Sequence, residues 1–157
     1  MQYGCMHVML KMNTDSISKS GTLGMPFAQE HPLSILVAED NPINKKVILT
    51  MLKRLGYDAD AVENGALCLT AVLNGSYDLV LSDIDMPEMD GLECTKRLRA
   101  AGVRIPIVAV TASSLYALDS CLAAGMDGYL PKPLPPGELL STLERAFEAK
   151  MRRLDGE

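Results

Sequence analysis

The sequence predicts an α/β fold, in which five strands form a doubly wound parallel sheet with helices on both faces. From Leu33 onward, short apolar runs alternate with stretches of helical periodicity. The links between them are short, which favours βα units joined by right-handed crossovers. The chain has 157 residues, 48% of them hydrophobic, and this is enough to bury one core. We therefore expect one domain, over residues 33–150.

The first βα unit has the clearest signals. Residues 34–38 form an apolar run that is typical of a strand buried on both faces. Asn41 can then cap a helix, and Pro42 suits its first turn. Apolar or small residues at helical spacing continue this helix until Gly56, namely Ile43, Val47, Thr50, Met51 and Leu55.

Four further units follow the first. Strands are predicted at residues 57–62, 77–81, 105–110 and 128–130. Helices are predicted from Asn64, from about Leu92, from a cap at Ser113 or Ser114, and from Glu138 to about Lys150. The inward face of the last helix is expected to carry Leu139, Leu140, Leu143, Ala146 and Phe147.

The two ends of the chain lack this patterning. Residues 1–32 show neither a helical nor a strand period, so we expect a flexible, disordered tail or linker there, and a short C-terminal tail at 151–157. Both histidines, His7 and His31, fall in the expected N-terminal tail. We therefore expect no imidazole chemistry in the folded part.

Composition excludes several classes of partner. The formal charge of −5 supplies no basic footprint for nucleic acid or an anionic membrane. No apolar run approaches the roughly 18 residues that span a bilayer. The four cysteines lie far apart without a CxxC pair, which favours reduced thiols and a cytoplasmic protein: Cys5, Cys68, Cys94 and Cys121.

Polar residues gather where the predicted strands end, the edge at which doubly wound sheets bind ligands. They are Glu39 and Asp40, Asp83 and Asp85, Thr111, and Lys132. Crowded carboxylates repel one another unless a cation neutralises them, and hard oxygen ligands suit Mg²⁺. One carboxylate beside such a metal can attack phosphorus, while a lysine and a threonine neutralise phosphoryl oxygens.

These residues resemble the motifs of response-regulator receiver domains, the CheY-like superfamily, over residues 34 to about 147. The matching stretches are VAEDN at 37–41, LSDIDMPEMDG at 81–91, VTA at 110–112 and YLPKP at 129–133. The resemblance implies a flavodoxin-like sheet with strand order 2-1-3-4-5. The stretch from Asn41 to Asn44 looks more like receivers of hybrid histidine kinases than like stand-alone chemotaxis regulators.

The resemblance also implies a role for each site residue. Asp83 would accept a phosphoryl group in the presence of Mg²⁺. Asp40 and Asp83 would bind the metal directly, Glu39 through water, and Asp85 through its backbone carbonyl. Thr111 and Lys132 would hold phosphoryl oxygens.

A conformational switch and a set of partners follow from the same resemblance. Thr111 would move toward the phosphoryl group and Tyr129 would turn inward, remodelling the fourth helix and fifth strand. That face, with the fifth helix, would bind a downstream effector. The phosphoryl donor would be a histidine kinase or a histidine phosphotransfer protein. The Lys132-Pro133 bond is expected to be cis.

Two departures from the family pattern accompany these expectations. Pro131 stands where the family has a backbone donor, and Pro135-Pro136 is expected to delay the last helix. Asp85 and Ser113 occupy positions that tune dephosphorylation in related domains.

Other interpretations remain open for these residues. Taken singly, Glu39 and Asp40 suit a helix entry, Thr111 a helix cap and Tyr129 core packing. A receiver that binds partners constitutively, or a small Mg²⁺-dependent phosphatase using Asp83 and Asp85, are the alternative functions. The convergence on one sheet edge favours a signalling domain that is not an enzyme, apart from its own phosphotransfer and autodephosphorylation.

Overall fold

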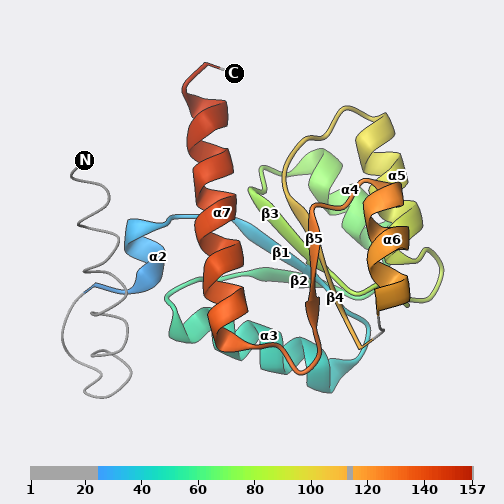
Figure 1. The fold of residues 1–157 in the computed structure, drawn as a ribbon, viewed down its shortest axis with the longest axis horizontal. Coiled ribbons are helices and arrows are strands. Elements are labelled where there is room, and N and C mark those ends of the chain that lie inside the picture. Colours follow the sequence, from blue (N-terminus) through green and yellow to red (C-terminus); the bar gives the residue numbers. More distant parts are fainter. Residues whose placement is uncertain (1–24, 113–114, 157) are drawn as a thin grey trace.

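The structure is a computed structural model that describes residues 25–112 and 115–156. Within these residues, five parallel strands form one sheet in the order β2-β1-β3-β4-β5 (Figure 1). The doubly wound fold and the strand order are therefore confirmed. The strands are β1 (Ile35–Ala38), β2 (Asp60–Val62), β3 (Leu79–Ser82), β4 (Ile107–Thr111) and β5 (Gly128–Pro131). The helices are α2 (Phe27–Glu30), α3 (Pro42–Arg54), α4 (Gly65–Asn74), α5 (Gly91–Ala100), α6 (Leu115–Ala124) and α7 (Pro136–Leu154).

The sheet separates two hydrophobic cores. Helices α2, α3 and α7 cover one face, and α4, α5 and α6 cover the other (Figure 1). Successive residues of a strand point to opposite faces, so Ile35 and Val37 enter the first core while Leu36 and Ala38 enter the second. Strands β1, β3 and β4 are buried throughout, as their apolar runs predict.

Helix capping follows the sequence closely. The side chain of Asn41 accepts hydrogen bonds from the backbone N–H groups of Ile43 and Asn44, and Pro42 occupies the first turn of α3. Asn64 accepts from Leu67 at the start of α4 in the same way. The cap expected at Ser113 or Ser114 lies outside the described residues.

The folded part begins before Leu33, earlier than expected. Residues 1–24 lie outside the described part, but Phe27–Glu30 form α2, and Phe27 and His31 are buried. The His31 ring stacks on Phe27 with centroids 4.2 Å apart and meets Phe147 edge-on at 5.2 Å. The prediction that residues 25–32 belong to a tail, and that the folded part holds no histidine, was therefore wrong.

The last helix also differs at both ends. It begins at Pro136, with Pro135 as its N-cap residue, so the two prolines start the helix rather than delay it. A proline in the first turn lacks only an N–H that has no intrahelical partner there. The helix continues to Leu154, so residues 151–154 are not a tail.

Three predicted strands begin later than their apolar runs, since β2 starts at Asp60, β3 at Leu79 and β4 at Ile107. The Tyr57 backbone N–H donates to the Leu52 carbonyl of α3 at 2.9 Å, its hydroxyl donates to the His31 carbonyl at 2.6 Å, and β2 begins at Asp60. The Ile105 carbonyl accepts from Arg99 Nη1 at 2.8 Å, and β4 begins at Ile107.

Three further observations concern the cysteines, the helices as membrane spans and the packing of α3. The described cysteines, Cys68, Cys94 and Cys121, are free and buried, as expected for small hydrophobic residues. No helix within the described ranges is both long and apolar enough to cross a bilayer. On α3, Ile48 and Leu52 are buried in the core and the predicted residues Met51 and Leu55 pack against it, whereas the predicted residues Ile43 and Val47 are exposed.

Candidate functional site

The carboxyl ends of the central strands lie at one edge of the sheet. Strand register pairs Ala38 with Ser82, and Ser82 with Ala109, so the residues that follow these strands converge. Glu39, Asp40 and Asp83 can each offer one oxygen within 4.8 Å of the others. The structure therefore brings together the acidic residues that the sequence predicted to be neighbours.

Asp83 is held firmly on one side. Its backbone N–H donates to the Ala38 carbonyl at 2.8 Å, and its Oδ1 accepts from the Ile84 N–H at 2.7 Å. Its Oδ2 lies 3.3 Å from Lys132 Nζ. The residue is 8% exposed. One carboxylate oxygen is thus fixed by the backbone and the other is left for charge interactions.

Lys132 supplies the positive charge of the site. Its Nζ lies 2.7 Å from Glu39 Oε1, and its backbone N–H donates to the Thr111 carbonyl at 3.0 Å, so the bond between β4 and β5 positions it. Burial alone would lower the pKa of the Lys132 ammonium, but Glu39 and Asp83 together outweigh burial and raise it. The ammonium stays charged. The Lys132-Pro133 bond is cis, as expected.

Glu39 is the most deeply buried acid of the site, at 1% exposure. Its Oε2 accepts from the Asn41 N–H at 3.2 Å. Its Oε1 is buried and meets the Lys132 ammonium as an ion pair rather than an aligned hydrogen bond. Burial raises the pKa of this carboxyl, the contact with Lys132 offsets part of the effect, and the charge of Asp83 adds to it. A second cation would relieve this crowding.

A glycine that the sequence reasoning did not assign to the site shapes the loop after Asp83. The Gly91 N–H donates to the Ile84 carbonyl at 2.8 Å, and a Cβ at this position would overlap the Asp83 carbonyl oxygen. Only glycine allows this approach. The DG pair before α5 was the available signal, because Asp90 caps that helix. The Asp85 side chain is exposed on the same loop.

The two expected switch residues lie on neighbouring strands. Thr111 ends β4, is 1% exposed, and pairs with Pro131. Tyr129 pairs with Ala109 and packs half-buried against the core beneath α4, α5 and α6. Tyr129 lies two positions before Pro131, the partner of Thr111, on the neighbouring strand. A movement of Thr111 would therefore take place close to Tyr129.

A model of the response regulator receiver domain family matches residues 35–144, which is more than half of the chain. The chain belongs to this family. It is 39% identical over 112 residues to the sensor histidine kinase RcsC of Salmonella typhi, covering 71% of this chain and 12% of that protein. It is 45% identical over 112 residues to the hybrid signal transduction protein dokA of Dictyostelium discoideum, covering 69% of this chain and 7% of that protein. This receiver therefore spans a small part of the relatives that it matches.

A solved relative carries a metal. The receiver domain of a Pseudomonas aeruginosa sensor histidine kinase, solved with a magnesium ion coordinated in its active-site cleft, superimposes with a TM-score of 0.69 at 39% identity. The match covers 74% of this chain and 98% of that one. The expected likeness to receivers of hybrid histidine kinases is confirmed, and a receiver is a signalling domain consistent with a phosphorelay.

Proposed function

We propose that this receiver accepts a phosphoryl group from a phosphohistidine onto Asp83, with Mg²⁺ as cofactor, and that the phosphorylated form changes its partner-binding face. The observation that carries the proposal is the convergence of three carboxylates and one ammonium at a single sheet edge. The ordering of Asp83 by two backbone hydrogen bonds supports it as the nucleophile.

The residues present fit a magnesium ion. The buried Oε1 of Glu39 lacks an aligned hydrogen bond, and oxygen donors from Asp40 and Asp83 lie within reach of it. We propose Asp40 and Asp83 as direct ligands, Glu39 as a ligand through water, and the Asp85 backbone carbonyl as a further ligand. The bound ion supplies charge neutralisation at the attacking and phosphoryl oxygens.

The transfer itself is a displacement at phosphorus. A carboxylate oxygen of Asp83 forms a bond to phosphorus while the bond from phosphorus to the histidine nitrogen breaks, and the imidazole leaves with the electron pair. The Lys132 ammonium, 3.3 Å from Asp83 Oδ2, is positioned to neutralise one phosphoryl oxygen. The Thr111 side chain would hold another. Protein groups thus act mainly by position and charge.

The donor has a candidate docking surface beside the site. Ile43 and Val47 lie one turn apart on α3, close after Asp40, and are 73% and 48% exposed. Exposed apolar side chains at this spacing suit a helix of a partner protein. We propose that a histidine kinase or a histidine phosphotransfer protein places its phosphohistidine over Asp83 by packing against these two residues.

The surface that responds to phosphorylation would be a different one from the donor-binding surface. We propose that phosphorylation draws Thr111 toward the phosphoryl group and turns Tyr129 inward, which alters the surface formed by α6, β5 and α7. Strand pairing of β4 with β5 supports this route, because Lys132 and Thr111 are joined by a backbone hydrogen bond. A downstream effector would bind there.

Acetyl phosphate tests the proposal directly. The protein is incubated with it in the presence and absence of Mg²⁺, and the bound phosphate is measured by intact mass and peptide mapping. We expect one phosphoryl group on Asp83, only with Mg²⁺, and none in Asp83→Asn, while Asp85→Asn remains labelled. Label on another residue, or none in the wild type, would contradict the proposal. Catalytic turnover of phosphomonoesters would favour the phosphatase alternative instead.

A further inference from the structure

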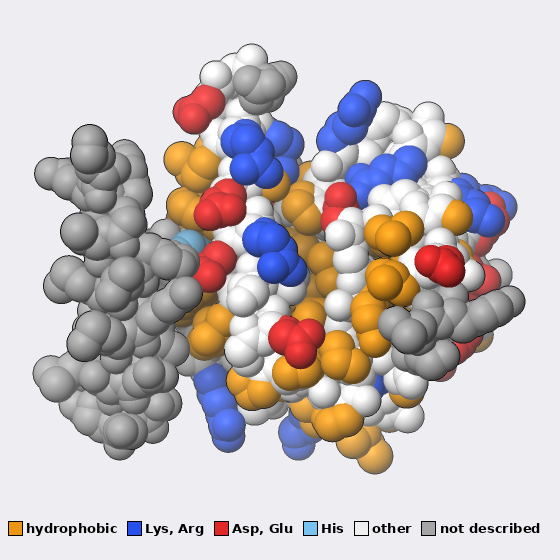
Figure 2. Space-filling model, in the orientation of Figure 1, with side chains coloured by type: hydrophobic (Ala, Val, Ile, Leu, Met, Phe, Trp, Pro, Cys, Tyr) orange, Lys and Arg blue, Asp and Glu red, His pale blue; other side chains and the backbone are white. Residues whose placement is uncertain are grey.

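A cleft lies between α7 and the amino-terminal end of β5, away from the acidic edge. Its volume is about 220 Å³. Val108, Gly128 and Ala149 contribute an apolar part of its lining, and Tyr129 lines it as well. In Figure 2, hydrophobic side chains gather between α7 and α6, and both basic and acidic side chains lie along α7. The cleft thus combines apolar surface with positive charge.

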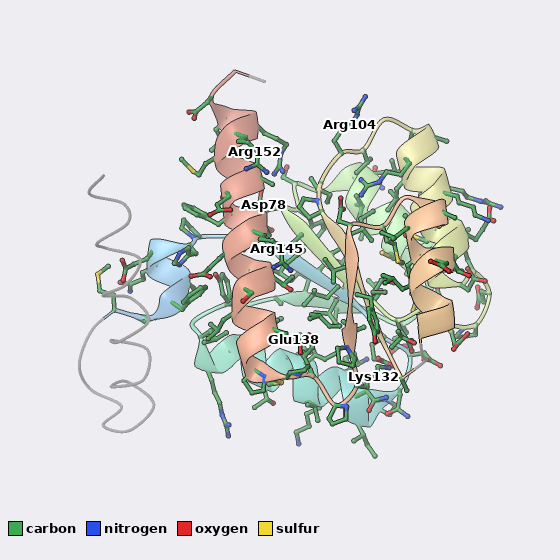
Figure 3. All side chains as sticks on the ribbon, in the orientation of Figure 1. Asp78, Arg104, Lys132, Glu138, Arg145 and Arg152 are labelled. Carbon is green, nitrogen blue, oxygen red and sulfur yellow. The ribbon has the colours of Figure 1, made fainter. Side chains whose placement is uncertain are left out.

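The positive charge comes from Arg145 and Arg152, which are seven residues apart on α7 and line the cleft together (Figure 3). Within the described ranges no carboxylate forms an ion pair with either guanidinium, and the contact of Arg145 with Thr142 Oγ1 is a long 3.4 Å. By contrast, Arg97, Arg99 and Arg153 each pair with an acid.

The one acid among the described residues of the lining does not neutralise these arginines. Asp127 Oδ2 accepts from Arg99 Nη2 at 2.9 Å and from the Ile107 N–H at 2.8 Å. Its charge is therefore already engaged with groups of the fold. As far as the described residues show, the positive charge of the two arginines is not neutralised, and it lies on a chain whose formal net charge is −5, so the charge is local and not a general property of the surface.

Gly128 leaves room beside the arginines. A Cβ built at this position meets no atom within 4 Å, so the strand is open to solvent there. An apolar side chain from another molecule could enter this space and contact Val108 and Ala149. Burial of one such side chain in a pocket, flanked by charge pairs, is the usual arrangement of a peptide anchor.

We propose that this cleft binds an acidic peptide segment of a partner protein, with one apolar side chain over Gly128 and carboxylates at Arg145 and Arg152. A polyanion such as nucleic acid fits less well, because among the described residues two arginines without an ion pair line the cleft, beside apolar side chains and the acid Asp127. The inference deepens the proposed function by naming the chemistry of a partner on the α6-β5-α7 face. The binding test uses the unphosphorylated protein, so its result does not depend on whether Asp83 accepts a phosphoryl group.

The test is an amide-shift titration of the unphosphorylated protein. The probe is the peptide Asp-Glu-Asp-Leu-Phe-Glu-Asp-Glu, with a control peptide in which lysine replaces every acid. We expect saturable shifts of the Gly128 and Ala149 amides with the acidic peptide only. Arg145→Glu and Arg152→Glu should each weaken binding about tenfold. The matched control Arg54→Glu, an exposed arginine on α3, should change nothing.

A second variant separates the apolar space from the charge. Gly128→Leu adds a side chain into open space, so the fold is kept while the cleft is filled. We expect binding of the acidic peptide to be lost. Equal shifts with the lysine peptide, unchanged affinity in both arginine variants, or tighter binding of an oligonucleotide at the same amides would each overturn the proposal.

Discussion

The two edges of the sheet differ in how far their acidic side chains are neutralised by neighbouring groups. At the amino-terminal edge, Asp78 binds Lys150, Arg153 and the Ser34 N–H, so its charge is balanced by the fold. At the carboxyl edge, Glu39, Asp40 and Asp83 lie close together, and the Lys132 ammonium pairs with Glu39 and Asp83. Charges that are balanced stabilise the fold. Under the proposed function, the charges that are left unbalanced bind a metal ion and a phosphoryl group.

The same difference appears in the neighbouring segments. Helix α2 packs Phe27 and His31 against Tyr57 and Phe147 at the amino-terminal side, and Lys150 Nζ donates to the Pro32 carbonyl at 3.0 Å. The loop after Asp83 is instead shaped by the close approach of Gly91. Changes at the amino-terminal edge should therefore affect stability, and changes at the carboxyl edge should affect phosphorylation.

The largest expected effect is on stability. Phe27→Ala removes a buried ring from the contact between α2 and the core, and should lower the free energy of unfolding by about 3 kcal/mol. Urea denaturation followed by circular dichroism measures it. The rate of Asp83 phosphorylation by acetyl phosphate should stay at the wild-type value in the folded variant. A large loss of that rate would show that the two edges are not independent.

A comparable effect on phosphorylation is expected at Gly91. A methyl group there overlaps the Asp83 carbonyl and displaces the nucleophile, so Gly91→Ala should slow phosphorylation about a hundredfold. Gly137→Ala is the matched control, because a Cβ at Gly137 meets nothing within 4 Å. Initial rates with acetyl phosphate compare the two variants. Equal rates in both would mean that this approach does not position Asp83.

A smaller effect should separate donor binding from chemistry. Ile43→Ala removes an exposed side chain beside the site, and should raise the KM for a phosphorylated histidine donor about tenfold. Its phosphorylation by acetyl phosphate, which needs no docking surface, should not change. Leu67→Ala, at a 50% exposed position on α4, is the control. A change of rate with both donors would place Ile43 in the chemistry rather than in docking.

The smallest expected effect is a pH dependence at the amino-terminal edge. The Tyr77 hydroxyl donates to Asp60 Oδ2 at 2.6 Å, which raises its pKa from a usual 10.0 to about 12. Because the folded-state pKa is the higher one, this hydrogen bond stabilises the fold fully below pH 10 and its contribution is lost between pH 10 and 12. Tyr77→Phe should lack this loss. Parallel unfolding curves for both proteins across that range would disprove the assignment.

The convergence of the candidate site residues could be predicted from sequence because each lies at the end of a strand. Glu39, Asp83 and Lys132 each follow directly from a strand, and parallel strands bring their carboxyl ends to one edge without any knowledge of register. The same locality explains the success with the caps at Asn41 and Asn64. Short-range patterns were sufficient for both.

Long-range contacts account for what the sequence did not reveal. Helix α2 has four residues and no period of its own, and it is stabilised by rings far away in the chain. The spacing of Ile43 and Val47 is the same for a core face and a docking face, so their exposure could not be inferred. The role of Gly91 depends on the Asp83 carbonyl, which only the folded chain brings close.

The central claim is that phosphorylation of Asp83 changes the surface formed by α6, β5 and α7. Amide shifts measured with beryllofluoride and Mg²⁺ test this claim most directly. In the wild type we predict shifts at Thr111, Tyr129 and Gly128 as well as at Asp83. In Lys132→Ala we predict shifts near Asp83 alone, because the charge that links the phosphoryl group to β5 is gone. Shifts confined to Asp83 in the wild type, or unchanged shifts at Tyr129 in Lys132→Ala, would contradict the account.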